Sequence, residues 1–232
     1  MYFDIFYIIL VVPALIFSFW ASAKVNSTFK KYSSVRSRRG MTGREAAEAV
    51  LRQNGVTGVI VSQISGNLTD HYDPRTNVIN LSEKVYNSDS VAAIGVAAHE
   101  AGHAVQHAEG YFPIRLRSAI IPLTNIGSKL SMPIFLLGLI LSAYGEKFLY
   151  IAYAGIICFS LCVLFQLVTL PTEFNASRRA VEAIDGSILD ETEAKGAKKV
   201  LSAAAMTYVA ALAVALMQLL RLLAIAGNRK RR

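Results

Sequence analysis

Two histidines and a glutamate lie at a spacing that could bind and use a metal ion, in the HEAGH stretch of residues 99–103. On an α-helix, residues four apart share one face and are separated by one turn. His99 and His103 could therefore bind one zinc ion, each at about 2 Å. Glu100 would project beside them and could take a proton from a water on that ion. The alternative is a helix whose polar residues pack under a loop, but the small residues of 91–108 predict the helix that metal binding requires.

A catalytic zinc ion usually has three protein ligands and a water, so a third ligand must come from elsewhere. Glu173, in the PTEFNASRR stretch of residues 171–179, is the best candidate. Between His103 and Glu173 the chain would cross a membrane twice, which returns both residues to the same side. A charge at the membrane boundary is costly without a partner, and the ion would be that partner. Pro171 suits a new helix start, so the alternative is a helix-start glutamate favoured by the helix dipole.

Three other residues are weaker ligand candidates. His107 would lie about 80° around the helix from His99 and about 12 Å along the helix axis, too far to share one ion with both His99 and His103. A contact to the substrate, or to a residue that binds the metal, is the more suitable role for His107. His71 lies in a turn-rich stretch and is expected to be an exposed loop histidine. Asp185, in Ile184-Asp185-Gly186, resembles the Leu-Asp-Gly element of intramembrane site-2 proteases, although Asp-Gly is also a common turn.

A zinc ion in such a site would polarise a scissile carbonyl and lower the pKa of its water toward about 7. Glu100 would take the proton and deliver it to the leaving amine. The developing oxyanion needs a further donor. The candidates for an oxyanion or substrate contact are His107, Asn175, Arg178 or Arg179, and Tyr208. The strand expected at residues 77–81 could bind an extended peptide along its edge, or could simply pair within a sheet.

The composition points to a membrane protein. Of the 232 residues 53% are hydrophobic and only 17% are charged, against about 25% charged in soluble domains. The apolar runs are 5–23, 118–145 (interrupted by Lys129), 148–172 and the weaker, Ala-rich 201–220. About 20 apolar residues span a bilayer as a helix. The first run lacks the basic leading region of a signal peptide and has bulky Trp20 near its end, so it is expected to be a retained anchor.

Basic residues beside the apolar runs predict the orientation. Residues 24–39 contain Lys24, Lys30, Lys31, Arg36, Arg38 and Arg39 and no acidic residue. Such a stretch is typical of a cytoplasmic flank, which leaves the N-terminus outside. The net charge of +8 is therefore attributed to membrane flanks, and no nucleic-acid partner is expected. Four full spans would, however, put the basic tail 229–232 outside, so either the last helix does not cross or the tail is an exception.

The polar stretch between the first and second runs predicts a small α+β unit. Thr42 and Glu45 could form a capping box, with Gly55 ending that helix. Residues 56–62 and 77–81 are expected strands, and the zinc helix is expected over 88–108. The predicted organisation is a transmembrane helix at 1–23, the cytoplasmic α+β unit at 24–117, a transmembrane hairpin at 118–172, a helical segment with the third ligand at 173–200, an apolar helix at 201–226 that either spans the membrane or packs as a buried helix, and a basic tail at 227–232.

These residues resemble known families. HEAGH between membrane helices, followed by Glu173 with Ala176 three residues on, is similar to the HtpX and CAAX prenyl protease group of gluzincins, whose third ligand lies in an E-x-x-A-D element. Ser177 stands where that group has Asp. The chain more fully resembles the YugP-like neutral zinc metallopeptidases of bacteria, through His71-Tyr72-Asp73-Pro74, Asn80-Leu81-Ser82 and residues 171–177. The FtsH-type proteases share HEAGH, but the sequence has no Gly-x-x-x-x-Gly-Lys loop, so this chain by itself is not expected to be an ATP-driven machine.

The resemblance implies a mostly α, multi-pass membrane metallopeptidase with three to four transmembrane helices and a small α+β gluzincin-like unit. The expected activity is that of a zinc metalloendopeptidase with one catalytic zinc ion, acting on membrane or misfolded proteins from the cytoplasmic side of the cell membrane. Its expected partners are a peptide or protein substrate and the lipid bilayer, with regulatory membrane partners or self-association also open. The alternative is a non-catalytic membrane scaffold with a structural zinc site, which would have four ligands and no use for Glu100 as a base.

Overall fold

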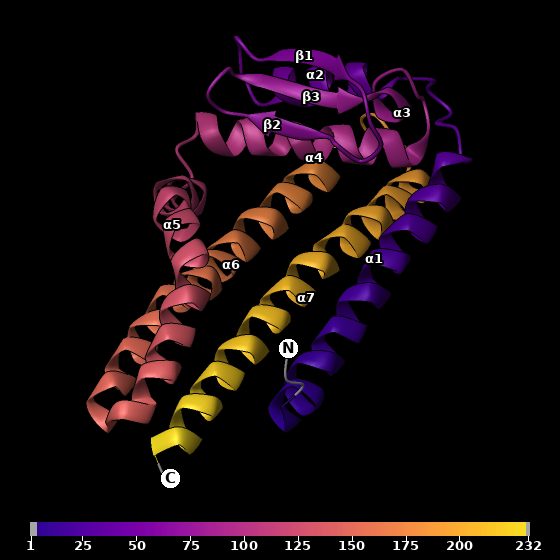
Figure 1. Cartoon of the computed structure of the whole chain (residues 1–232). Helices are drawn as coiled ribbons and strands as arrows, with labels where there is room; N and C mark the ends of the chain where they lie inside the picture. The colour runs from indigo at the N-terminus through magenta and orange to yellow at the C-terminus, as the bar shows by residue number, and fades with distance from the viewer. Residues whose placement is uncertain (1–3, 231–232) are drawn as a thin grey trace. The chain divides into compact units, whose positions relative to one another are not determined.

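The computed structural model describes residues 4–230, which divide into two compact units (Figure 1). The helical unit consists of the residues up to Trp20, Leu116–Leu170 and the residues from Tyr208 onward. The sheet unit consists of Ala21–Arg115 and Pro171–Thr207. Each unit is therefore assembled from segments that are far apart in the sequence.

The sheet unit is built on three short strands and three helices from the polar stretch. In chain order these are α2 (Gly43–Gln53), β1 (Ile60–Ile64), β2 (His71–Asp73), β3 (Val78–Ser82), α3 (Glu83–Tyr86) and α4 (Val91–Ala108). The strand order is β1-β3-β2, with β1 parallel and β2 antiparallel to β3. Helix α4 packs against α2 and against strands β2 and β3 (Figure 1). The core between them contains the fully buried Ile79, Leu81 and Ile94.

Local sequence signals explain where these helices begin and end. The Thr42 side chain accepts a hydrogen bond from the Glu45 backbone and the Glu45 carboxylate accepts one from the Thr42 backbone, which confirms the capping box. Gly55, with a φ of +64°, follows the end of α2. Helix α4 is capped by the Ser90 hydroxyl, which accepts from the Ala93 backbone. It therefore begins at Val91, later than the signal at residue 88 predicts.

The strands differ from the predictions in ways that matter for the site. Strand β1 begins at Ile60 rather than at residue 56, and β2 lies in the stretch predicted to be only turns. Strand β3, predicted at 77–81, is the central strand and pairs with β1 on one side and β2 on the other. The prediction that this strand adds a peptide at a free edge is therefore wrong, because both of its edges are already paired.

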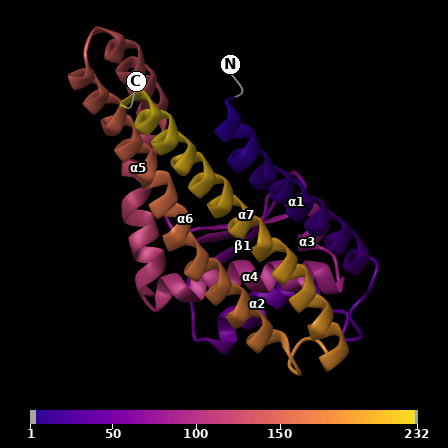
Figure 2. The same cartoon turned by 90° about the horizontal axis from the view of Figure 1, so that it is seen from below.

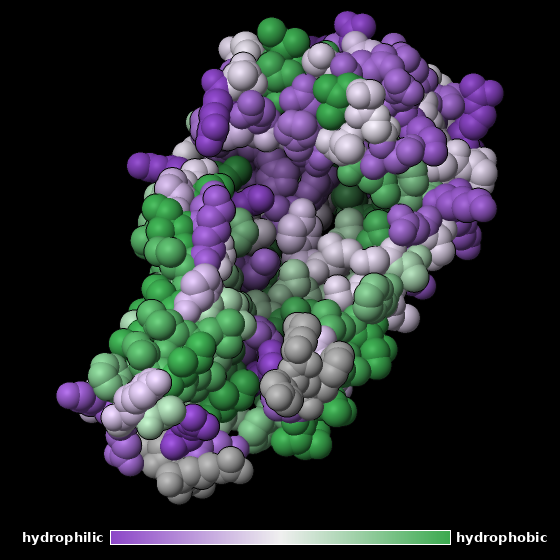
Figure 3. Space-filling view, in the orientation of Figure 1, coloured by the Kyte–Doolittle hydropathy of each residue, from purple (hydrophilic) through white to green (hydrophobic). Residues whose placement is uncertain are grey.

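The helical unit is formed by parts of four long helices. These are α1 (Val12–Ser33, preceded by the π-helical Tyr7–Val11), α5 (Phe112–Leu141), α6 (Leu149–Ile184) and α7 (Glu191–Lys230). All four are long and apolar enough to cross a membrane, which confirms a mostly α membrane protein. Helices α5 and α6 run side by side in both views and are joined by two short 3₁₀ turns (Figures 1 and 2). The visible face of this unit is largely hydrophobic (Figure 3), with Leu137, Ile140 and Leu164 exposed as lipid contact requires.

Two of the helices continue where the sequence predicts a boundary. Helix α6 runs through Pro171 to Ile184 without a break, so the new helix start predicted at Pro171 is wrong. Glu173 is therefore an interior residue of a long helix rather than a first-turn glutamate. Helix α1 continues ten residues beyond the predicted end at Ala23. Helix α7 includes the predicted 201–226 run and reaches Lys230, while Arg231 and Arg232 of the basic tail lie outside the described residues.

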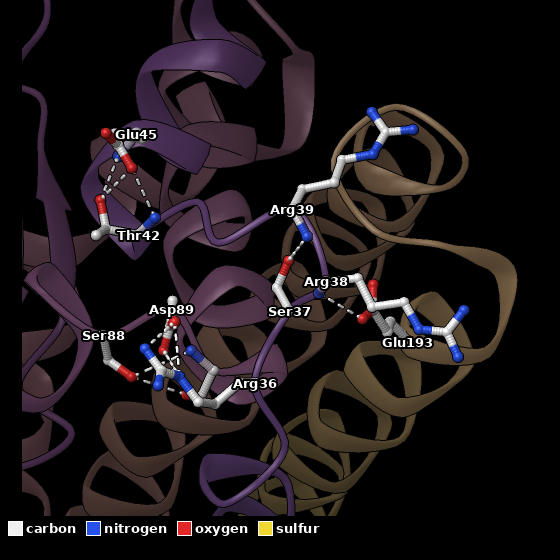
Figure 4. A network of polar contacts seen from close by, with 10 residues as sticks. Arg36, Ser37, Arg38, Arg39, Thr42, Glu45, Ser88, Asp89 and Glu193 are labelled. Atoms are coloured by element: carbon white, nitrogen blue, oxygen red, sulfur yellow. Dashed lines mark hydrogen bonds and ion pairs between the residues drawn. The ribbon is translucent and has the colours of Figure 1, made fainter.

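The basic segment after α1 is tied into the sheet unit (Figure 4). The Arg36 guanidinium lies 2.7 Å from the Asp89 carboxylate, just before α4. The Arg38 backbone donates to Glu193 on α7, and its side chain lies 2.8 Å from Asp190. Part of the positive charge that predicts a membrane flank therefore holds this segment to the beginnings of α4 and α7.

Candidate metal centre

Helix α4 presents His99 and His103 on one face, as their spacing predicts. Their ring centroids are 4.7 Å apart. Glu173, from α6, reaches the same point: its Oε2 lies 3.3 Å from His99 Nε2 and 3.4 Å from His103 Nε2. The Glu173 side chain is only 3% exposed. Within residues 4–230 these three form the only group of His, Cys, Asp or Glu that could hold a metal ion.

The geometry of this group fits a zinc ion. Ligands held at about 2.1 Å in a tetrahedral arrangement lie about 3.4 Å from one another. The two nitrogen-to-oxygen distances, 3.3 and 3.4 Å, match that separation. Two imidazoles and one carboxylate are also the ligand types of catalytic zinc, with the fourth position left for water.

A glycine lets the two helices approach closely enough to form the group. A Cβ added at Gly102 would lie 2.8 Å from the carbonyl oxygen of Ala176 on α6. Ala176 is itself fully buried. Only hydrogen at position 102 and a small side chain at 176 leave room for this approach, which brings Glu173, one turn before Ala176, to the histidine pair.

Each histidine has a polar partner on its other ring nitrogen. Ser177 Oγ lies 3.1 Å from His99 Nδ1, and Gln106 Oε1 lies 3.0 Å from His103 Nδ1. Partners of this kind fix the orientation of a metal-binding ring and raise its basicity. Ser177 occupies the Asp position of E-x-x-A-D, and its hydroxyl reaches the ring all the same.

Glu100 is held in place by the neighbouring strand. It is 8% exposed, and its Oε2 accepts a hydrogen bond of 3.0 Å from the Tyr72 backbone N–H on β2. Sequence reasoning missed this contact because it missed β2. The His-Tyr-Asp stretch contains Tyr72, which favours a strand, but it lies among residues that favour turns. The sequence pattern therefore predicts turns here rather than a strand.

The charge of Glu173 acts on the histidines. Burial alone would lower the pKa of His103, but the hydrogen bond to Glu173 and the charge of that carboxylate outweigh burial, and the pKa is raised. In the absence of a metal ion, a proton on His103 would therefore supply the positive charge beside Glu173.

The remaining candidates lie elsewhere or are already engaged. His107 is exposed on α4 and its ring packs edge-on against Tyr72, with centroids 5.9 Å apart. Asn175 Oδ1 accepts from both Gln106 and Arg179. His107 does not belong to the ligand group.

Two further candidates, Arg178 and Asp185, are not brought to the group. Arg178 is exposed, 4.0 Å from Glu182. Asp185 is exposed in the turn after α6 and is not a ligand in the group. Tyr208 belongs to the helical unit, and its role as a contact to the oxyanion or the substrate stays a prediction from the sequence. His71 lies on β2 rather than in a loop and is exposed, as predicted.

Gln106 is the residue that sequence reasoning missed most completely. It is fully buried on α4 and contacts His103 one turn earlier. The signal that could have found it is its position three residues after His103, because residues at that spacing share a helix face.

Four apolar helices and a clustered pair of histidines with a buried glutamate are the features of a multi-pass membrane protein with a site of the zinc-peptidase type. The chain belongs to the family described as "Putative neutral zinc metallopeptidase", whose model matches residues 7–227. It is 48% identical over 223 residues to the "Putative membrane protease YugP" of Bacillus subtilis (strain 168), a match that covers 96% of this chain and 97% of that protein. No solved structure matches the chain.

Membership of this family confirms the resemblance to YugP-like proteins, and the four apolar helices agree with a multi-pass membrane protein. The roles of individual residues rest on the geometry described above.

Proposed function

We propose that this protein is a zinc metalloendopeptidase of the cell membrane in which His99, His103 and Glu173 hold one catalytic zinc ion. The observation that carries the proposal is the position of Glu173 Oε2, 3.3 and 3.4 Å from the two imidazole Nε2 atoms. Glu173 comes from a second helix and lies far from both histidines in the sequence, so local chain geometry does not account for its position beside them.

Glu100 is the general base of the proposed reaction. A zinc ion, when bound, supplies a Lewis acid and a water whose pKa is about 7. The Tyr72 N–H holds Oε2 of Glu100, which leaves Oε1 to accept a proton from that water. The same carboxyl group then donates the proton to the nitrogen of the leaving amine. Burial of Glu100 keeps competing water away from this transfer.

His107 and Tyr208 are the proposed contacts to the oxyanion or the substrate. Asn175 and Arg179 are less suited, because their side chains already bond to Gln106 and Glu109 respectively. The substrates are membrane or misfolded proteins, reached from the cytoplasmic side, since the sheet unit contains the basic stretch 24–39.

The test compares the purified full-length chain with Glu100→Gln in the cleavage of an unstructured protein. We expect the variant to bind zinc as tightly as the wild type and to cleave about 10²–10⁴-fold more slowly, because that is what general base catalysis contributes. Glu182→Gln removes an exposed glutamate from α6 and serves as the matched control with unchanged cleavage. Equal cleavage by the wild type and Glu100→Gln would show that Glu100 is not the base.

The second candidate is a scaffold with a structural zinc ion. A structural site needs four protein ligands, whereas the group within residues 4–230 offers three. This observation favours the catalytic site, and cleavage by the wild type would decide between the two.

A further inference from the structure

Gln106 connects the two helices that supply the metal ligands. Its side chain is fully buried and makes three hydrogen bonds. The Oε1 atom lies 3.0 Å from His103 Nδ1. The Nε2 atom donates to the Thr172 carbonyl oxygen and to Asn175 Oδ1 on α6, both at 2.8 Å. A fully satisfied amide with no solvent contact has one orientation available.

The partners of the amide determine which way it points. The Thr172 carbonyl can only accept a hydrogen bond, so the group facing it must be the NH₂ of Gln106. The second acceptor is fixed in the same way, because Asn175 Oδ1 also receives the Nε hydrogen of Arg179, which can only donate. The carbonyl oxygen of Gln106 therefore has to face His103.

An oxygen that faces His103 Nδ1 decides the tautomer of that ring. The amide oxygen accepts only, so Nδ1 must carry a hydrogen. In the neutral ring the lone pair then lies on Nε2, the nitrogen that is 3.4 Å from Glu173 Oε2. The chain of contacts runs outward from Asn175 to Arg179, whose guanidinium lies 2.7 Å from Glu109. The orientation of one metal ligand is thus fixed by a buried network that crosses from α4 to α6.

We propose that Gln106 is a positioning residue for the metal centre, with two separable halves. Its carbonyl oxygen holds His103 in the tautomer that can bind zinc through Nε2. Its NH₂ group ties α4 to α6 and fixes the direction of the carbonyl oxygen. The inference rests on the proposed zinc site, and it adds a residue that touches neither the ion nor the substrate.

Two substitutions separate these halves. Gln106→Met keeps the length and volume of the side chain and removes both hydrogen-bonding groups. It leaves no buried acceptor isolated, because the Thr172 carbonyl belongs to helix α6 and Asn175 keeps Arg179, so the variant should fold. Gln106→Glu retains an oxygen that can accept from His103 but loses the NH₂ donor toward α6.

The test measures the zinc affinity of the full-length proteins by competition with a chromophoric chelator, and the thermal midpoint of the metal-free proteins. We expect Gln106→Met to weaken zinc binding by about 10–100-fold. Gln106→Glu should bind zinc within about 3-fold of the wild type, yet have a lower metal-free thermal midpoint than the wild type. A residue that only packs two helices would change stability in both variants and affinity in neither.

Asn175→Ala is the matched control from the same network. It removes one acceptor of the Gln106 amide but leaves the Thr172 carbonyl to orient it, so zinc affinity should stay within about 3-fold of the wild type. Wild-type affinity in Gln106→Met, or equal losses in the Met and Glu variants, would overturn the inference alone. Absence of zinc binding by the wild type would instead overturn the proposed metal centre.

Discussion

A single carboxylate oxygen, Oε2 of Glu173, lies between two imidazole nitrogens at almost equal distances, 3.3 and 3.4 Å. Such a buried carboxylate needs positive charge beside it, and either a zinc ion or a proton on His103 can supply it. The metal ion and the proton therefore compete for the same atoms. Zinc binding at the proposed centre therefore requires the loss of this proton.

This competition predicts that stabilisation by zinc grows with pH. The pKa of His103 is raised by Glu173, so in the metal-free protein the His103–Glu173 pair stabilises the fold below the ordinary histidine pKa of about 6.5. That contribution is lost as the pH rises through the raised pKa. Zinc binding has the opposite dependence, because it requires the proton to leave.

The measurement is the increase in thermal midpoint on saturation with zinc, at about pH 6 and about pH 8, where His protonation differs most. We expect the larger increase at the higher pH. His71→Gln, which alters an exposed histidine outside the group, should leave this dependence unchanged. The same increase at both pH values would contradict competition between zinc and a proton at His103.

At the scale of an element, the short strand β2 matters because one of its backbone groups faces Glu100. Tyr72 pairs with Ile79 in register, and its N–H points away from β3 and donates to Glu100. Proline is tolerated on a strand edge where the N–H makes no ladder bond. Tyr72→Pro therefore removes this donor without breaking the sheet.

We expect Tyr72→Pro to cleave substrate about 10-fold more slowly than Tyr72→Ala, since a hydrogen bond to a charged group contributes about 1.5–3 kcal/mol. The alanine variant is the control, because it also loses the ring and the hydroxyl bond to Asn77 but keeps the N–H. Zinc affinity should be the same in both. Equal rates would mean that the strand does not orient the base.

The contact between α4 and α6 can be tested in the same manner. A methyl group at Gly102 would lie 2.8 Å from the Ala176 carbonyl oxygen, so Gly102→Ala must push α6 away from α4. Glu173 would move with α6, and zinc affinity should fall by at least about 10-fold, as it does when the groups that orient ligands are disturbed.

Gly227→Ala is the matched control for this prediction. Position 227 lies in helix α7 with no heavy atom within 4 Å of an added Cβ. Alanine there should raise helix stability slightly, by up to about 1 kcal/mol, and leave zinc affinity unchanged. Zinc affinity of both variants is measured by competition with a chromophoric chelator. Unaltered affinity in Gly102→Ala would show that the close approach is not needed for metal binding.

The parts of this site that could be predicted from sequence are those set by local spacing. His99, Glu100 and His103 share a turn of helix, and their arrangement follows from helix geometry alone. Glu173 was reached through the number of membrane crossings between it and His103. Gln106 and the Tyr72 N–H could not be predicted, because their roles depend on how α6 and β2 pack against α4. The unbroken helix at Pro171 is a similar case, in which packing overrides a local signal.

At the scale of the molecule, contacts inside the helical unit bear on how the chain crosses the membrane. The Arg221 guanidinium on α7 lies 2.6 Å from Asp4, which precedes α1, and 5.0 Å from the Tyr7 ring. Arg229, near the end of α7, donates to Ser142 in the α5–α6 turn. The start of α1, that turn and the end of α7 therefore lie at one end of the helical unit, which is the arrangement expected if all four helices cross the membrane.

If all four helices cross the membrane, the two basic stretches lie on opposite sides, so the orientation can follow only one of them. The stretch 24–39 carries Lys24, Lys30, Lys31, Arg36, Arg38 and Arg39 and follows the first helix, which usually dominates orientation. We therefore expect the sheet unit in the cytoplasm and the α5–α6 turn outside. The basic tail is then the exception, and Arg229 is already partnered by Ser142.

Labelling of single cysteines in intact cells tests this orientation. In a background with Cys158→Ala and Cys162→Ala, Tyr144→Cys would place a thiol in the α5–α6 turn, where Tyr144 is 81% exposed. Ser187→Cys would place one in the exposed turn between α6 and α7. We expect a membrane-impermeant maleimide to label position 144 in intact cells and position 187 only after permeabilisation, because only an outside thiol meets the reagent. The reverse pattern would put the proposed metal centre outside the cell, and cleavage of cytoplasmic proteins would then be impossible.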